Sequence, residues 1–171
     1  MNATFAHALS LVLKEEGGNV DDPRDPGGRT SQGITQRTYD GWRAQHGEQT
    51  RDVFRIDPAE RDAIYKASYW DVIGGDDLPA GVDYAVFDFA VNSGTGRAAK
   101  TMQDIVGSPV DGAIGPNTLA AVRNKPAAAT IQMLCDDRLA FLKGLNTWPT
   151  FGKGWSARVE RVRKAALAMV A

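Results

Sequence analysis

The sequence predicts a mainly α-helical fold with one short irregular or β-hairpin segment near its start. Apolar residues recur at helical spacing along most of the chain, and several of these stretches begin with residues typical of helix N-termini. Residues 19–34 instead combine prolines and glycines, which preclude a regular helix but allow a short hairpin. A chain of 171 residues, 43% of them hydrophobic, is expected to form one core or one core with a small appendage.

The first predicted helix begins near Phe5 and ends at about Glu16. Its apolar face, carried one turn further, reaches Glu16, whereas Glu15 is rotated towards the edge of that face. Gly17 and Gly18 then end the helix, because glycine readily adopts the backbone conformations that follow a helix. The two adjacent acids are therefore predicted to lie in different environments.

Two further helices have recognisable start signals. Thr35 is placed to cap a helix that ends before Gly47. A stronger signal combines Asp57 as N-cap, Pro58 in the first turn and Glu60 three residues after the cap. The helix that follows this signal carries three aromatic residues towards its end, namely Tyr65, Tyr69 and Trp70.

The second half of the chain has the pattern of several helices. One helix leads from Val82 towards Asn92 and is interrupted at Gly94, and shorter helices follow over 97–106 and 117–122. A long amphipathic helix then runs to about Leu145, and a basic helix is expected from about Trp155. We expect residues 1–93 to form one domain and residues 94–171 a small helical domain packed against it.

Composition excludes several classes of function. A net charge of -1 and the absence of a recognisable binding motif argue against a nucleic-acid partner. No apolar run is long enough to span a membrane, and the first residues lack the pattern of a secretory signal, so we expect synthesis in the cytoplasm. One cysteine excludes an internal disulfide, and His7, His46 and Cys135 lie too far apart in sequence to suggest a zinc site.

The acid-rich stretch from Lys14 to Thr35 allows three interpretations: a solvated loop, a calcium site, or an active site with two carboxyl groups. Its carboxylates belong to Glu15, Glu16, Asp21, Asp22 and Asp25. The stretch lacks the alternating ligands and distal glutamate of an EF-hand, which disfavours calcium. Partial burial at the end of an apolar face favours the protonated form of Glu16, whereas backbone N–H groups and Arg24 or Arg29 favour ionised loop acids. Glycoside hydrolysis requires two carboxyl groups in such different environments.

The segment "EEGGNVDDPRDPGGRTSQGIT" resembles the signature of glycoside hydrolase family 108, a lysozyme-like family found in phage endolysins and bacterial muramidases. Downstream, "YKASYW" and "FDFAVNSG" are similar to later segments of that family, and "VDGAIGPNTLAAV" with "GKGWSARV" resembles its companion peptidoglycan-binding domain. The resemblance implies a lysozyme-like α+β fold, a catalytic domain over 1–93 and a peptidoglycan-binding domain over 94–171.

Carried over by position, the catalytic acid of the family falls on Glu16. The wider phage-lysozyme spacing of a Glu, an acid and a Thr, started from Glu16, lands on Asp25 and Ser31, with neighbouring Thr30 as an alternative hydroxyl group. Asn19 stands where the family commonly has an aromatic residue.

Other candidate residues have both a functional and a structural interpretation. Tyr69 and Trp70 suit sugar stacking but also suit a core. Asn92 is placed to bind an N-acetyl group or to cap its helix, and Cys135 is expected to be a small core residue. The basic end of the chain is expected either to meet an anionic envelope polymer or to form a solvated helix face; it carries Lys153, Arg158, Arg161, Arg163 and Lys164.

The resemblance implies hydrolysis of peptidoglycan glycan strands between N-acetylmuramic acid and N-acetylglucosamine, without a cofactor. Glu16 is the expected general acid, and Asp25 would orient water or stabilise the oxocarbenium-like transition state. The alternatives are a lytic transglycosylase acting on the same bond and a non-catalytic wall-binding or secretion-accessory protein. We expect a monomer that reaches the wall through a holin or a dedicated export route.

Overall fold

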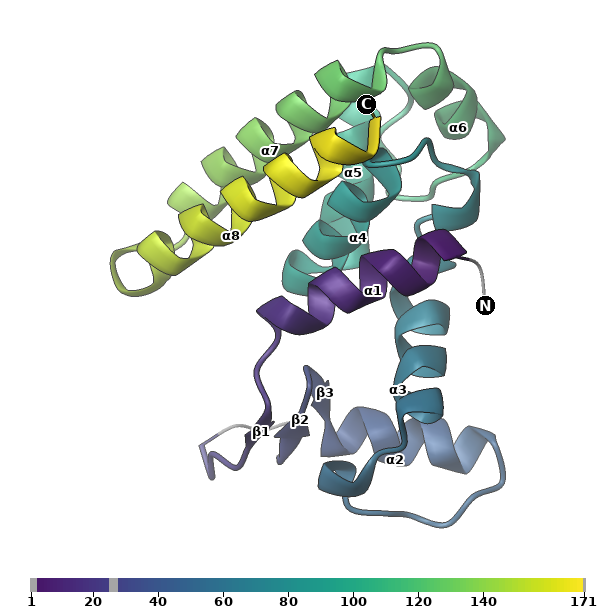
Figure 1. Ribbon diagram of the computed structural model, residues 1–171, viewed down its shortest axis with the longest axis vertical. Coiled ribbons are helices and arrows are strands. Elements are labelled where there is room, and N and C mark those ends of the chain that lie inside the picture. The colour runs from purple at the N-terminus through teal and green to yellow at the C-terminus, as the bar shows by residue number, and fades with distance from the viewer. Residues whose placement is uncertain (1–2, 25–27, 171) are drawn as a thin grey trace. The chain divides into compact units, whose positions relative to one another are not determined.

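The computed structural model describes residues 3–24 and 28–170. Its contacts divide the chain into two compact units, which we call the hairpin unit (Leu9–Ala67) and the helical unit (Met1–Ala8 with Ser68–Ala171). Helices dominate the described residues, and the described strands form one small antiparallel sheet (Figure 1). The predicted mainly α fold is confirmed.

The hairpin unit contains three very short strands followed by helices. Helix α1 (Ala3–Glu15) leads into the unit. Strands β1 (Asn19–Val20), β2 (Thr30–Ser31) and β3 (Ile34–Thr35) pair in the order β1-β2-β3. The sheet register pairs Asn19 with Ser31 and Thr30 with Thr35. The chain then continues through α2 (Gln36–Gln45), the 3-10 turn η1 (Val53–Arg55) and α3 (Pro58–Tyr65).

The predicted helix starts in this unit are confirmed at the level of individual bonds. The hydroxyl group of Thr35 accepts a hydrogen bond from the backbone N–H of Thr38 at 3.2 Å, which caps α2. The carboxylate of Glu60 accepts from the backbone N–H of Asp57 at 3.2 Å at the start of α3. Glu60 also accepts a hydrogen bond from the Tyr39 hydroxyl group and forms an ion pair with Arg43. Because Tyr39 and Arg43 belong to α2, these contacts link α3 to α2. Burial acts to raise the pKa of Glu60, but these hydrogen bonds and the nearby arginines leave that pKa lowered.

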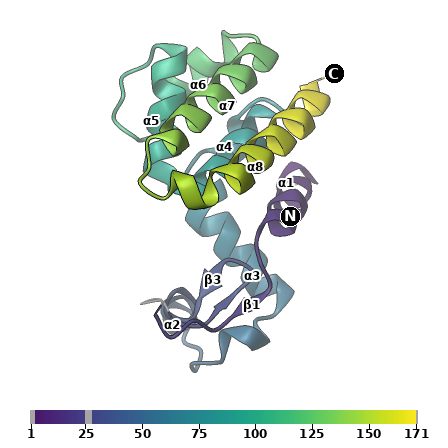
Figure 2. The same cartoon turned by 90° about the vertical axis from the view of Figure 1, so that its left-hand side faces the viewer.

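The helical unit is a bundle around one central helix, which is buried from Val82 to Ala90. A π-helical turn, η2 (Lys66–Trp70), crosses the boundary between the units, and a 3-10 turn, η3 (Gly75–Asp77), follows it. The unit continues with α4 (Val82–Ser93), α5 (Thr95–Val106), α6 (Pro116–Arg123), α7 (Ala127–Lys143) and α8 (Trp148–Val170). Helices α5, α7 and α8 pack against α4, and α7 and α8 lie side by side (Figures 1 and 2).

This packing bears on two expectations about the second half of the chain. Because α4 and α5 belong to one compact unit, the contacts do not separate residues 1–93 from 94–171, and that division stays a prediction. Cys135 on α7 is buried, as expected, and burial raises the pKa of its thiol to about 11.

The last helix begins earlier than the sequence indicated. It starts at Trp148 rather than near Trp155, although Gly152 and Gly154 disfavour a helix in this stretch. A Cβ atom on Gly152 would lie 2.6 Å from the Cδ2 atom of the Trp148 ring. Gly152 is therefore required for the packing of that ring within the helix and does not end the helix.

A buried ion cluster joins three helices of the unit. The carboxylate of Asp88 on α4 is completely buried and pairs with Arg138 of α7 at 2.7 Å and with Arg158 of α8 at 2.9 Å. Farther along α8, Arg163 pairs with Asp136 at 2.8 Å. Two of the five basic residues expected to form an external basic face are thus engaged in contacts between helices.

Candidate active site

Glu16 lies immediately after the last residue of α1, with its side chain partly buried. Its backbone N–H donates to the carbonyl oxygen of Val12 at 3.1 Å, so the helical hydrogen-bond pattern still includes it. Val12 is fully buried, and the side chain four residues later emerges on the same face. Gly17 and Gly18, both exposed, then release the chain from the helix.

The turn between β2 and β3 has an unusual backbone. Its two central residues, Gln32 and Gly33, have φ angles of 48° and 80°, and the flanking residues Ser31 and Ile34 pair with each other. Positive φ at both central positions is the requirement of a type I′ hairpin turn, which normally prefers Asn-Gly. A glutamine in the left-handed region carries a cost of about 1–2 kcal/mol because its Cβ approaches the backbone.

The carboxyl group of Glu16 and the hydroxyl group of Tyr65 both lie against the bare Cα of Gly33. A Cβ atom on Gly33 would lie 3.0 Å from Oε2 and 3.3 Å from Cγ of Glu16, and closer still to Oη of Tyr65. The site therefore requires glycine for two reasons, the positive φ and the close approach of these two side chains.

Helix α3 holds the other residue of the turn. The Tyr65 hydroxyl donates to the main-chain carbonyl of Gln32 at 2.7 Å, and Arg61 Nη1 donates to the side-chain Oε1 of Gln32 at 2.8 Å. Arg61 is itself paired with Asp62 at 2.7 Å. Glu16, Gln32, Gly33 and Tyr65 thus form one cluster within the hairpin unit.

The two hydroxyl residues named from the sequence lie next to this turn on β2. Ser31 is 2% exposed, whereas Thr30 is partly exposed. Neighbouring residues of a strand point to opposite faces of the sheet. Only one of these hydroxyl groups can therefore serve the face on which a substrate would lie, and Thr30 is the more accessible.

The predicted second carboxylate, Asp25, lies outside the described residues. Before it, Arg24 pairs with Asp22 at 2.8 Å, and the hydrogen bonds from Arg24 lower the pKa of that carboxyl group. After it, the Arg29 guanidinium lies 3.7 Å from the centre of the Phe54 ring and pairs with Asp52 at 2.5 Å. The interpretation that basic residues keep loop acids ionised is thus supported for Asp22.

The expectation that Trp70 lines a sugar-binding cleft needs correction. Trp70 belongs to the helical unit, is 0% exposed and packs against Phe5 and Phe87 with ring centroids 5.4 and 5.3 Å away. Its indole N–H donates to Asp76 at 2.7 Å. No face of the ring is open to a sugar, so Trp70 is a core residue, whereas Tyr69 beside it is partly exposed.

Asn92, near the end of α4, is partly exposed and has a fixed orientation. Its Oδ1 accepts from Nη2 of Arg138 at 3.2 Å. Because a guanidinium group only donates hydrogen bonds, the oxygen of the amide must face Arg138. The NH₂ group of Asn92 is then the part of the amide that points away from Arg138.

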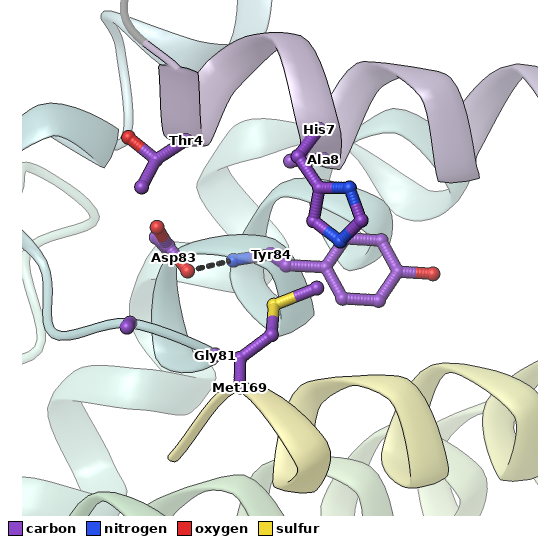
Figure 3. Close-up of a pocket in the computed structure, with 8 residues that line it drawn as sticks. Thr4, His7, Ala8, Gly81, Asp83, Tyr84 and Met169 are labelled. Atoms are coloured by element: carbon purple, nitrogen blue, oxygen red, sulfur yellow. Dashed lines mark hydrogen bonds between the residues drawn. The ribbon is translucent and has the colours of Figure 1, made fainter. Parts of the chain in front are cut away.

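Glu16 is not among the residues that line the two pockets described next. A mostly apolar pocket of about 330 Å³ in the helical unit surrounds the start of α4 (Figure 3). There Asp83, which is 4% exposed, accepts from the backbone N–H of Tyr84 at 2.7 Å, and burial raises its pKa. A polar pocket of about 360 Å³ lies in the hairpin unit; its lining residues are Arg29, Gln36, Asp40, Thr50, Arg51 and Asp52.

Within residues 3–24 and 28–170, no three His, Cys, Asp or Glu side chains are grouped as metal ligands. None of the helices in these same ranges has both the length and the apolar character needed to cross a membrane.

Sequence reasoning missed the residues that surround Glu16. A signal for the turn was present, since Gln-Gly stands between two β-prone pairs in "TSQGIT". Arg61 and Tyr65 are four residues apart on one helix, a spacing that places them on one face. Nothing in the sequence connects that face to a turn about thirty residues earlier, because this contact depends on the tertiary fold.

Comparison with known proteins agrees with this arrangement of elements. No match was found among curated proteins. Among solved structures, Brucella abortus SagA is 50% identical to this chain, with a TM-score of 0.85, and the match covers 98% of this chain and 95% of that one. Residues 9–94 match the family described as glycosyl hydrolase 108, a match that supports a glycosidase acting on peptidoglycan and ends where the expected C-terminal domain begins. The chain belongs to the glycosyl hydrolase 108 family.

Proposed function

We propose that this protein is an N-acetylmuramidase, which hydrolyses the bond between N-acetylmuramic acid and N-acetylglucosamine, and that Glu16 is its general acid. The observation that carries this proposal is the confinement of the Glu16 carboxyl group. It lies partly buried at the end of α1, with Oε2 3.0 Å from the position that a Cβ of Gly33 would occupy. A general acid needs such confinement, since its proton must stay close to the bond that breaks.

The proposed reaction follows the chemistry of two carboxyl groups. Glu16 gives its proton to the glycosidic oxygen as the bond from that oxygen to C1 of the muramic acid breaks. Positive charge that develops at C1 and the ring oxygen is stabilised by Asp25, or Asp25 orients the water that attacks C1. The oxygen of that water stays on C1, one of its protons is released, and a new reducing end results.

Three groups outside this carboxyl pair are proposed to assist. Either Thr30 or Ser31 would help to hold the attacking water, and Thr30 is the more accessible of the two. The amide of Asn92 would donate to a carbonyl oxygen of the substrate, such as that of an N-acetyl group, because Arg138 occupies its oxygen. Tyr69 is proposed as a platform for a sugar ring, for which an aromatic face is suited.

We also retain the proposal that residues 94–171 bind the wall polymer. The proposed contacts with an anionic polymer are the basic residues of α8 whose side chains are exposed, namely Lys153, Arg161 and Lys164. Because these charges are few and solvated, this contact is expected to weaken strongly as salt concentration rises.

The neighbouring acids provide a matched experiment. Glu16→Gln removes the proton that the reaction needs and keeps nearly the same shape, whereas Glu15→Gln makes the identical change one residue earlier, on a side chain that is also partly buried. On purified peptidoglycan, Glu16→Gln should release almost no new reducing ends and Glu15→Gln should keep most of the wild-type rate. Equal activity of the two variants, with both folded by circular dichroism, would contradict the assignment. Wild-type protein that binds the wall but cuts no bond would instead indicate a non-catalytic binding protein.

A further inference from the structure

Two side chains on one face of α3 hold the same residue of the β2–β3 turn. Tyr65 donates from its hydroxyl group to the main-chain carbonyl of Gln32 at 2.7 Å. Arg61, one helical turn earlier, donates to the side-chain Oε1 of Gln32 at 2.8 Å. Tyr65 is 1% exposed, so its hydroxyl group is fixed by the packing of its ring as well as by this bond.

The turn needs such support because its first central residue is poorly suited to its backbone. Gln32, with φ of 48°, is the one non-glycine residue at positive φ within residues 3–24 and 28–170. A glutamine in the left-handed region is disfavoured, and such conformations persist where the surrounding structure over-determines them. The hydrogen bonds from α3 hold both parts of Gln32 in place: Tyr65 bonds to its main chain and Arg61 to its side chain.

Gly33 is the residue of the turn that lies against the carboxyl group of Glu16. One point, the place where a Cβ of Gly33 would lie, is within 3.0 Å of both Glu16 Oε2 and Tyr65 Oη. A displacement of the turn towards that point would press on the carboxyl group, and a displacement away from it would open space beside the group. The location of Oε2 therefore depends on the conformation of the turn.

From these contacts, and on the basis of the proposed function, we propose that Tyr65 is a positioning residue for Glu16. In this role it acts through the Gln32–Gly33 turn, since Gly33 lies against the carboxyl group of Glu16. Arg61 assists by holding the side chain of the same glutamine. Since a shift of about 1 Å in a catalytic group can cost about a hundredfold in rate, loss of the Tyr65 hydroxyl should reduce turnover more than substrate binding.

The first test removes one hydroxyl group from each of two buried tyrosines of the hairpin unit. Tyr65→Phe removes the hydrogen bond to Gln32. Tyr39→Phe is the control: it removes a hydroxyl group from an equally buried tyrosine of α2, which bonds to Glu60 of α3 and not to the turn. Rates are measured over a range of concentrations of soluble, peptide-free glycan strands. Tyr65→Phe should lower kcat about tenfold or more with KM changed less than about twofold, whereas Tyr39→Phe should keep kcat close to that of wild type.

A second variant tests whether the effect passes through the turn. Asn-Gly adopts the type I′ conformation by its own preference, so Gln32→Asn should need less support from α3. The double variant Tyr65→Phe with Gln32→Asn should therefore be faster than Tyr65→Phe alone. A double variant no faster than the single one would overturn the link through the turn, and a Tyr65→Phe protein with wild-type kcat would overturn the positioning role altogether.

The design separates this inference from the proposed function. If wild-type protein releases no sugar, or if Glu16→Gln stays active, the proposed function fails and the inference fails with it. If activity depends on Glu16 but not on Tyr65, only the positioning role is wrong. Circular dichroism and the unfolding temperature of each variant verify that a rate change is not a loss of folded protein.

Discussion

Gly33→Ala and Gly47→Ala form a pair of substitutions whose difference in stability can be worked out from the structure. Both glycines lie in the hairpin unit at similar positive angles, with φ of 80° and 71°. Alanine at either position carries the left-handed penalty of about 1–2 kcal/mol. At Gly47 the new methyl group has no atom within 4 Å, so the backbone penalty is the whole cost of this substitution.

At Gly33 the methyl group adds a second cost. It would lie 3.0 Å from Oε2 of Glu16 and even closer to Oη of Tyr65, which is held by its bond to Gln32. Overpacking of this kind costs a further ~1–3 kcal/mol, which gives a total of about 2–5 kcal/mol for Gly33→Ala. For a chain of this size, each kcal/mol lowers the unfolding temperature by about 2–4 °C.

Thermal unfolding followed by far-ultraviolet circular dichroism measures this difference. We expect the unfolding temperature to fall by about 2–8 °C in Gly47→Ala and by about 4–20 °C in Gly33→Ala. Activity should be lost only in Gly33→Ala. Equal decreases in the two variants would refute the argument that Glu16 and Tyr65 crowd the bare face of Gly33.

Three further predictions concern the helical unit. Asp88→Asn removes the carboxylate that neutralises the buried guanidinium groups of Arg138 and Arg158. The free energy of unfolding measured in urea should therefore fall by about 3–5 kcal/mol. A fall of less than about 1 kcal/mol would mean that the cluster is hydrated. Trp70→Phe should lower stability by about 1–3 kcal/mol but leave KM for soluble glycan strands unchanged, and a raised KM would restore its role in sugar binding. Burial raises the pKa of Cys135 from 9.0 to about 11, so this thiol contributes stability below pH 9 that is lost as pH rises through about 11. Iodoacetamide should accordingly label it at pH 8 only in urea, and labelling of the folded protein would show that the thiol is accessible.

Local signals in the sequence were sufficient for helices whose starts depend on neighbouring residues. The caps at Thr35 and Asp57 are satisfied within three residues, so their geometry follows from local chemistry. The position of Glu16 at the end of an apolar face is also local, because it depends only on the period of the helix that precedes it.

Other features depend on contacts between distant residues and were missed or misread. Trp70 at the end of an aromatic run suits both a cleft and a core, and only its packing on Phe5 and Phe87 decides for the core. The early start of α8 depends on a glycine that admits the Trp148 ring, although glycine ordinarily disfavours a helix. Gln32 has no strong turn preference of its own. Its left-handed conformation is stabilised by hydrogen bonds from Arg61 and Tyr65 of α3, which the local sequence does not reveal.

The most direct test of the central claim is product analysis in water labelled with oxygen-18. Wild-type protein and Glu16→Gln are incubated with purified peptidoglycan, and the released fragments are identified by mass spectrometry. The account predicts that wild type releases fragments ending in N-acetylmuramic acid with one labelled oxygen at the new reducing end, and that Glu16→Gln releases almost none. Unlabelled anhydro sugars would show that the protein is a lytic transglycosylase, and labelled fragments from Glu16→Gln at the wild-type rate would show that Glu16 is not the general acid.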